Sequence, residues 1–243
     1  MAKQLRLDKY LADMGIGTRS EIKTWIRKGR VKVNGFVCSK PEQKVTLSDD
    51  DISFDDKKIN YIGYLYIMLH KPAGVVSATM DNVSKTVLDL IQDKQGKDLF
   101  PVGRLDKDTE GLLLLTNDGD LTHQLLSPKK HVDKVYYSKV KGKVTEDDQR
   151  AFLKGVDIGE ESLTLPAKLT ILASDDISEI ELTIQEGKFH QVKRMFEAVG
   201  KEVIYLKRLS MGSLVLDPNL EIGEYRELTK EEVDKLKNIN RNE

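Results

Sequence analysis

The short segment 103–111 carries several charged side chains and has a glycine at each end. An apolar run at Leu112–Leu115 follows directly and predicts a buried strand, which a turn at 117–119 ends. A loop held by a buried strand can present a carboxylate rigidly at the edge of a cleft. Asp106 is therefore a candidate catalytic carboxylate. It is equally a candidate turn or cap residue, because aspartate often serves loops in that way.

A basic stripe near the amino terminus is the second chemical feature. Arg19, Lys23 and Arg27 recur at every fourth residue, so on a helix they share one face. The positive charge continues beyond this helix at Lys28, Arg30 and Lys32. A solvated helix face explains an isolated charge run, but a stripe on a compact scaffold suits the phosphate backbone of structured nucleic acid. We expect these six residues to bind RNA.

The net charge of −1 hides an asymmetry along the chain. Residues 1–45 carry eleven Lys or Arg against four Asp or Glu, whereas the remainder carries 28 basic and 36 acidic residues. A basic amino-terminal part on an acidic body indicates that an anionic partner contacts the amino-terminal part first.

Length and composition exclude several other classes of protein. The 243 residues can bury a real core, and the uncharged stretch 59–70 is too short to cross a bilayer. Charged residues near the amino terminus interrupt any signal-peptide pattern, so we expect a cytoplasmic protein with no membrane partner. The single Cys38 and four scattered histidines predict neither a disulfide nor a metal site.

The first sixty residues predict a helix-helix-hairpin unit. One helix is expected up to Met14, and a capping box of Thr18 and Glu21 begins the next. Asn34-Gly35 between valine-rich segments is a strong hairpin signal. Residues 46–62 are expected to form an acidic connection, which divides the chain into domains 1–62 and 63–243.

The second domain alternates predicted strands with short helices. We expect strands at 65–69, 112–115, 135–140, 169–172 and 180–184, and helices at 121–126, 146–154, 189–199 and after Thr229. This order predicts an α+β fold with a mixed, largely antiparallel sheet. A Rossmann fold is excluded, because no G-x-G-x-x-G follows a strand.

The segment 189–199 is expected to present two different sides. Its apolar residues Phe189, Val192 and Phe196 are predicted to face the core. That orientation leaves His190 and Lys193 toward the cleft.

Three short segments resemble the small RNA-binding domain named after small-subunit ribosomal protein four. They are R-L-D-K-Y-L-A at 6–12, G-T-R-S-E at 17–21 and G-R-V-K-V-N-G at 29–35. This module occurs in ribosomal proteins, synthetases and modification enzymes. The resemblance therefore implies an RNA ligand and leaves the reaction open.

The segment G-R-L-D-K-D-T-E-G-L-L-L-L-T-N-D-G at 103–119 resembles the catalytic signature of RNA pseudouridine synthases of the RsuA-like, small-subunit branch. Further similar segments follow in the expected order: K-V-Y at 134–136, E-G-K-F-H-Q-V-K-R-M at 186–195 and L-K-R-L-S-M-G at 206–212. Together with the amino-terminal module, the similarity spans nearly the whole chain.

The resemblance implies that uridine in ribosomal RNA, more specifically of the small subunit, is isomerised to pseudouridine without a cofactor. It assigns Asp106 as the catalytic carboxylate, as a nucleophile or as a proton acceptor in an elimination route. Lys193 is implied as the cation that keeps this carboxylate ionised, and Tyr136 as the ring that stacks on the flipped uracil. From the residues alone, Lys193 could be a solvated lysine and Tyr136 a sheet tyrosine.

The remaining substrate-binding candidates are Arg104, His190, Leu206 and Leu209. Arg104 is expected to hold a phosphate or fill the gap left by the extruded base. The two leucines are expected to form an apolar wall under the base, although plain core packing explains them equally well.

Two alternatives remain open at this stage. One is the same reaction on large-subunit RNA, and the other is a non-catalytic RNA-binding factor of ribosome assembly. The expected partner is ribosomal RNA or a ribosomal subunit assembly intermediate, contacted by a monomer.

Overall fold

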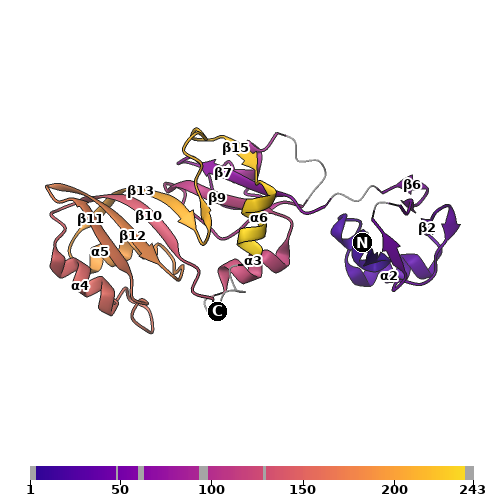
Figure 1. Cartoon of the computed structure of the whole chain (residues 1–243), viewed down its shortest axis with the longest axis horizontal. Coiled ribbons are helices and arrows are strands. Elements are labelled where there is room, and N and C mark those ends of the chain that lie inside the picture. The colour runs from indigo at the N-terminus through magenta and orange to yellow at the C-terminus, as the bar shows by residue number, and fades with distance from the viewer. Residues whose placement is uncertain (1–3, 48, 60–62, 93–97, 128–129, 239–243) are drawn as a thin grey trace. The chain divides into compact units, whose positions relative to one another are not determined.

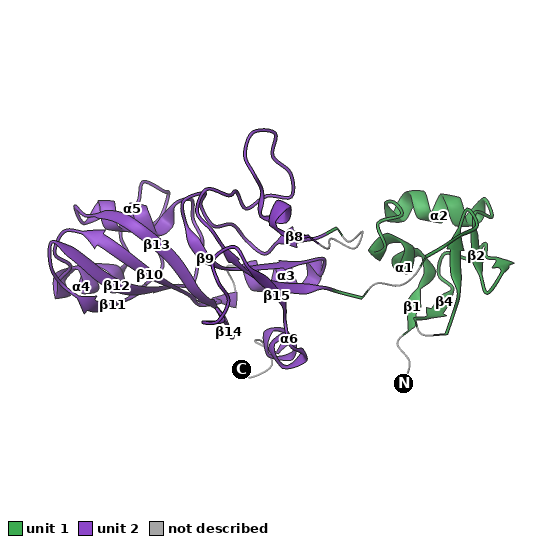
Figure 2. Ribbon diagram, turned by 90° about the horizontal axis from the view of Figure 1, so that it is seen from above, with its two compact units in different colours: residues 1–64, 94–98 green, residues 65–93, 99–243 purple. Residues whose placement is uncertain are grey.

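The computed structural model describes residues 4–47, 49–59, 63–92, 98–127 and 130–238. The chain forms two compact units, which Figure 2 shows in different colours. Unit 1 comprises residues 1–64 and 94–98, and unit 2 comprises 65–93 and 99–243. The predicted domain boundary at residue 62 lies outside the described residues. Each unit buries a hydrophobic core of its own.

Unit 1 contains two helices and short strands. The helices are α1 (Leu7–Asp13) and α2 (Arg19–Arg27). The strands are β1 (Gln4–Arg6), β2 (Val31–Val33), β3 (Phe36–Val37), β4 (Lys44–Thr46), β5 (Ile52–Phe54) and β6 (Lys57–Lys58). The predicted helix-helix-hairpin unit is therefore present, and it carries additional strands.

Local sequence signals explain the beginning of this unit. The hydroxyl of Thr18 accepts from the backbone N of Glu21, whose carboxylate accepts from the N of Thr18, so the predicted capping box is formed. Asn34 and Gly35 both adopt positive φ, which the tight turn between β2 and β3 requires.

The expected acidic connection at 46–62 contains a strand, β5, where the sequence has short apolar alternation at Ile52 and Phe54. The segment β5 pairs antiparallel with β2, and Ile52 is buried in the core of unit 1. Its alternation of apolar and polar residues is long enough for a three-residue strand. This pairing brings the acidic turn at Asp55 and Asp56 back onto the basic hairpin.

Unit 2 is built on a nine-stranded sheet, whose main path has the strand order β11-β12-β10-β13-β9-β7-β15 (Figure 1). The remaining strands, β14 and β8, pair with β13 and β9 and are labelled in Figure 2. The strands are β7 (Tyr66–Lys71), β8 (Phe100–Pro101), β9 (Glu110–Thr116), β10 (Lys134–Lys141), β11 (Lys168–Ala173), β12 (Ile177–Ile184), β13 (Glu202–Met211), β14 (Leu214–Val215) and β15 (Tyr225–Glu227). Only β13 and β9 pair in parallel among the described strands. The predicted α+β fold with a mixed, largely antiparallel sheet is confirmed.

Short helices accompany this sheet. They are the 3-10 helix η1 (Val87–Leu90) and the α-helices α3 (Gly119–Leu126), α4 (Glu146–Lys154), α5 (Gln191–Ala198) and α6 (Lys230–Lys237). Val192 and Phe196 of α5 are buried in the sheet's hydrophobic core, so α5 packs on the face that also carries Tyr136 and Leu206. Within the described ranges, no helix is long and apolar enough to span a bilayer.

The parallel junction between β9 and β13 depends on a glycine. Gly111 pairs with Arg208 and has a φ of 103°, a conformation that side chains disfavour. A Cβ atom at this position would lie 2.6 Å from the backbone N of Arg208. Gly111 therefore lets the two backbones approach, which places the segment before β9 beside β13.

Candidate active site

Asp106 lies in the loop between β8 and β9, as the glycine-bounded segment predicts. Its carbonyl accepts from the backbone N of Thr109 at 3.1 Å, which closes a turn. On the other side, the hydroxyl of Ser77 donates to the carbonyl of Leu105 at 2.9 Å and accepts from its N at 3.0 Å. The loop is therefore fixed on both sides of the carboxylate.

A fully buried lysine, Lys71, stabilises the loop between β8 and β9 through hydrogen bonds to its backbone. The Nζ of Lys71 donates to the carbonyl oxygens of Asp106 at 3.0 Å, Thr109 at 2.8 Å and Pro72 at 3.0 Å. Burial lowers the pKa of Lys71 to about 8, because the low-dielectric interior disfavours its charge. Sequence reasoning missed this residue. Its one signal is a lone lysine at the end of an apolar strand.

Two basic side chains from the segment around α5 reach the carboxylate of Asp106. The Nζ of Lys193 lies 3.5 Å from Oδ2, and the Nε2 of His190 lies 3.6 Å from Oδ1. Lys193 also donates to both oxygens of Asp108, at 2.6 and 2.8 Å. These contacts hold the pKa of Asp108 below its usual value, chiefly through the hydrogen bond from Lys193.

Asp106 opens into a small cavity of about 70 Å³. The predicted residues Arg104, Tyr136, His190 and Leu206 line this cavity together with Asp106. Tyr136 lies on β10 and Leu206 on the neighbouring β13, and the registers of these strands bring both side chains to one face of the sheet. A carboxylate, an aromatic ring and an apolar wall thus converge, with Lys193 at the carboxylate.

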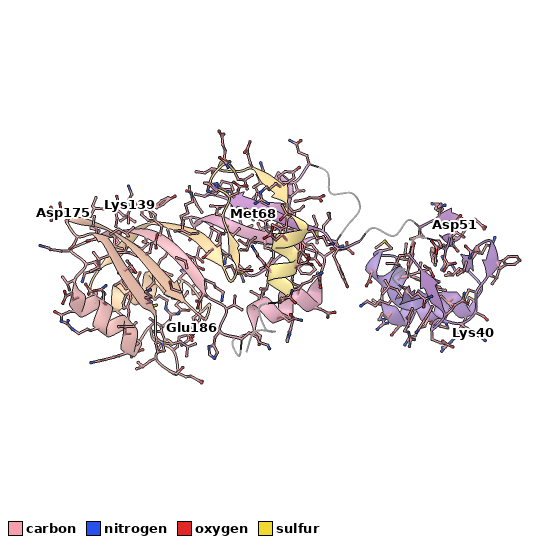
Figure 3. The ribbon with its side chains drawn as sticks, in the orientation of Figure 1. Lys40, Asp51, Met68, Lys139, Asp175 and Glu186 are labelled. Carbon is pink, nitrogen blue, oxygen red and sulfur yellow. The ribbon has the colours of Figure 1, made fainter. Side chains whose placement is uncertain are left out.

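The carboxylate of Glu186, labelled in Figure 3, stabilises the turn before α5. Glu186 Oε1 accepts from the backbone N of Leu165 and from Nε2 of Gln191, both at 2.8 Å. His190 then adopts a left-handed conformation with φ 47° and ψ 34°, so α5 begins at Gln191 and not at 189. Because Phe189 precedes the helix, its ring is 71% exposed, and the prediction that it faces the core is wrong.

The prediction that Leu209 lines the base pocket is also wrong. Leu209 follows Leu206 by three residues on β13, so the two side chains face opposite sides of the sheet. A register shift there pairs Arg208 with Tyr136 and Ser210 with Val135, which leaves Leu209 in a bulge. Leu209 lines a different cavity, together with His70.

Thr109 is a further residue at the cavity that sequence reasoning missed. Its side chain is almost fully buried, and its Oγ1 has no hydrogen-bond partner in the described part of the chain. It lines the same cavity as Asp106. No group of three His, Cys, Asp or Glu residues with metal-binding geometry occurs among the described residues.

Acidic side chains of unit 1 pair with some cations of the basic stripe. Arg30 forms a bidentate ion pair with Asp55, and Lys32 pairs with Asp56. Arg19 contacts the buried Asp8 at 3.3 Å while its side chain stays 55% exposed. The residues of the stripe without an ion pair among the described residues are Lys23, Arg27 and Lys28.

Comparison with known proteins assigns the chain to a class of RNA-modifying enzymes. The family model for RNA pseudouridylate synthase matches residues 65–198, and that for the S4 domain matches residues 5–51. The chain therefore belongs to the RNA pseudouridine synthase family and is an isomerase, with an S4 RNA-binding domain before the catalytic part. The resemblance on which the sequence prediction rested is confirmed.

Individual relatives are similar over nearly their full length. An uncharacterized RNA pseudouridine synthase of Bacillus subtilis is 47% identical over 96% of this chain and 98% of its own. Ribosomal small subunit pseudouridine synthase A of Vibrio cholerae is 41% identical over 94% of this chain and 98% of its own. Ribosomal large subunit pseudouridine synthase B of Bacillus subtilis is 42% identical over 96% of this chain and 95% of its own. A crystal structure of a pseudouridylate synthase, 41% identical, superposes with a TM-score of 0.68 over 96% of this chain and 99% of that one.

Proposed function

We propose that this enzyme isomerises a uridine of ribosomal RNA, specifically of the small subunit, with Asp106 as the catalytic carboxylate. The observation that carries the proposal is that Asp106 and Tyr136 line one small cavity, while the Nζ of Lys193, which is not a lining residue, lies 3.5 Å from the Asp106 carboxylate. An internal isomerisation needs a group that handles the sugar or the base, a cation that keeps it ionised and a surface that holds the detached ring. These three side chains match those needs.

In the proposed reaction the N1–C1′ bond of uridine breaks, the uracil turns in the pocket, and a C5–C1′ bond forms. The proton on C5 is lost and N1 gains one, so atoms balance without a cofactor. Asp106 acts as nucleophile or as proton acceptor, and both routes require its ionised form. The Nζ of Lys193 and the Nε2 of His190 lie 3.5 and 3.6 Å from the two oxygens of this carboxylate.

Tyr136 and Leu206 are proposed to hold the uracil during its rotation. Both side chains are largely buried and line the cavity, so a flipped base would meet an aromatic ring and an apolar wall. The Tyr136 hydroxyl makes no hydrogen bond within the described ranges, which leaves it available to the substrate. Arg104 is exposed at the same cavity and is proposed to hold an adjacent phosphate.

Small-subunit RNA is proposed because several similar proteins, from Vibrio cholerae and Haemophilus influenzae among others, bear the name of a small-subunit synthase. Large-subunit RNA is the second candidate, since a relative of comparable identity bears the name of a large-subunit synthase. We further propose that the enzyme acts in the cytoplasm as a monomer on ribosomal RNA or on an assembly intermediate. A non-catalytic assembly role is disfavoured by the intact set of side chains at the cavity.

The test is to incubate the enzyme separately with unmodified small-subunit and large-subunit ribosomal RNA, and with assembly intermediates of each subunit, and to map pseudouridine in each. We expect one modified uridine in the small-subunit RNA and none in the other. Modification of the large-subunit RNA alone would overturn the subunit assignment, and modification of neither RNA nor of assembly intermediates would overturn ribosomal RNA as the substrate.

A further inference from the structure

Phe189 exposes its ring beside the candidate active site. Its centroid lies 3.8 Å from that of the His190 imidazole at an interplanar angle of 19°, so the two rings are stacked. His190 in turn lies 3.6 Å from Asp106 through Nε2. A single exposed apolar side chain is ordinary on a protein surface. Here, however, the exposed ring stacks on a histidine that itself contacts the proposed catalytic carboxylate, which is a more specific arrangement.

The backbone around this pair is held in place. His190 adopts a left-handed conformation, which residues other than glycine rarely do. Arg194 Nη1 donates to the carbonyl of Phe189 at 3.0 Å, and the backbone N of Lys188 donates to Oε1 of Gln191 at 2.9 Å. Strain of this kind persists where surrounding contacts determine the conformation, and it concentrates at functional sites. These contacts fix the backbone from which the exposed ring projects.

We propose that Phe189 is a substrate-binding residue on which a base next to the target uridine stacks when RNA is bound. This inference rests on the proposed function, because it requires a uridine flipped toward Asp106. Flipping removes the stacking contacts between that uridine and its neighbours, and an aromatic ring outside the cavity replaces one of them.

The surroundings of Phe189 fit an RNA base better than an apolar partner. Arg104 is exposed at the cavity that His190, the stacking partner of Phe189, also lines, and it supplies positive charge for a flanking phosphate. Every base presents a planar face, so the stack adds affinity without selecting a particular neighbouring base. The expected signature is therefore a change in KM, with kcat preserved.

The experiment uses unmodified ribosomal RNA labelled with tritium at C5 of uridine, because pseudouridine formation releases that label to water. We expect Phe189→Leu to raise KM roughly 5- to 100-fold, the range that corresponds to removing one base–aromatic stack, with kcat close to wild type. Phe189→Tyr keeps the ring and restores KM. Leu172→Ala is the matched control, because Leu172 is also exposed, at 53%, but lies on β11 at the end of the sheet order.

The outcomes separate this inference from the proposed function. Wild-type activity with an unchanged KM in Phe189→Leu would overturn the inference alone. A loss confined to kcat, or a shifted pH profile of kcat, would also overturn it, because Phe189 would then act through His190 on the chemistry. Absence of tritium release by the wild-type enzyme from all ribosomal RNA and from assembly intermediates would overturn the proposed function, and the inference with it.

Discussion

The Nζ of Lys193 lies 2.6 Å from Oδ1 of Asp108 and 3.5 Å from Oδ2 of Asp106. The side chain of Asp108 is 71% exposed and that of Asp106 only 27%. The ammonium group of Lys193 therefore lies between a carboxylate at the surface and a more buried one. The hydrogen bond from Lys193 keeps the pKa of Asp108 below its usual value, so Asp108 is ionised at neutral pH. Asp108 therefore orients Lys193, which in turn reaches the carboxylate at the cavity.

Removal of the ammonium group is expected to harm catalysis more than removal of its outer partner. We predict that Lys193→Met lowers kcat roughly 100-fold, the scale of removing one charge-stabilising group from an active site. Asp108→Asn keeps the ammonium beside Asp106 and is predicted to lower kcat less than about 10-fold, since it breaks only a solvent-exposed ion pair. Tritium release from labelled RNA measures both. Equal reductions in the two variants would contradict the pairing of Lys193 with Asp106.

Lys71 gives the enzyme a specific dependence of stability on pH. Its pKa in the folded protein is about 8, against an ordinary value of 10.5. Between these values the unfolded chain binds more protons than the folded chain, so Lys71 makes the free energy of unfolding rise with pH in this window. We expect the stability of wild type relative to Lys71→Met to increase from about pH 7.5 to about pH 10 in urea titrations. A pH-independent difference between the two proteins would refute the lowered pKa.

Gly111 is predicted to tolerate no side chain. Because a methyl group would collide with the backbone of Arg208 and φ is positive, Gly111→Ala should lower the free energy of unfolding by about 2–4 kcal/mol. Gly119→Ala is the matched control, since nothing lies within 4 Å of a Cβ built there. Thermal and urea unfolding compare the two variants. Similar stability of both would show that β9 and β13 do not approach as closely as described.

The ion pairs within the basic stripe predict which of its charges contribute most to RNA affinity. Changing Lys23, Arg27 and Lys28 to Gln should flatten the log-log dependence of binding on salt by roughly 0.7–0.9 for each phosphate that the protein no longer neutralises. Arg30→Gln combined with Lys32→Gln should change the slope less, because Asp55 and Asp56 already pair with these cations. Filter binding with ribosomal RNA at several salt concentrations measures the slopes. A larger effect from the second pair would reverse this assignment.

Local signals were sufficient for much of the fold. The capping boxes at Thr18 and Thr229 begin helices as predicted, and α4 spans the predicted residues 146–154. Such signals act within a few residues, so they can be read without the tertiary structure. The resemblance to a known family added the set of residues that converge at the cavity.

The errors arose where tertiary structure overrides a local pattern. Phe189 fits the apolar spacing of α5, but the left-handed conformation of His190 makes the helix begin at Gln191, so Phe189 lies before it. Leu209 follows Leu206 in a similar segment, but the strand's alternation and a bulge turn it to the other face. Lys71 has no sequence pattern of its own, because its hydrogen-bond partners lie 35 and more residues away, apart from the adjacent Pro72.

The most direct test of the central claim is Asp106→Asn, a nearly isosteric change that removes the charge and its capacity as nucleophile or proton acceptor. The account predicts that this variant unfolds at the wild-type temperature and binds ribosomal RNA normally, while its tritium release falls at least about 1000-fold. Tritium release near the wild-type rate by the folded variant would contradict Asp106 as the catalytic carboxylate.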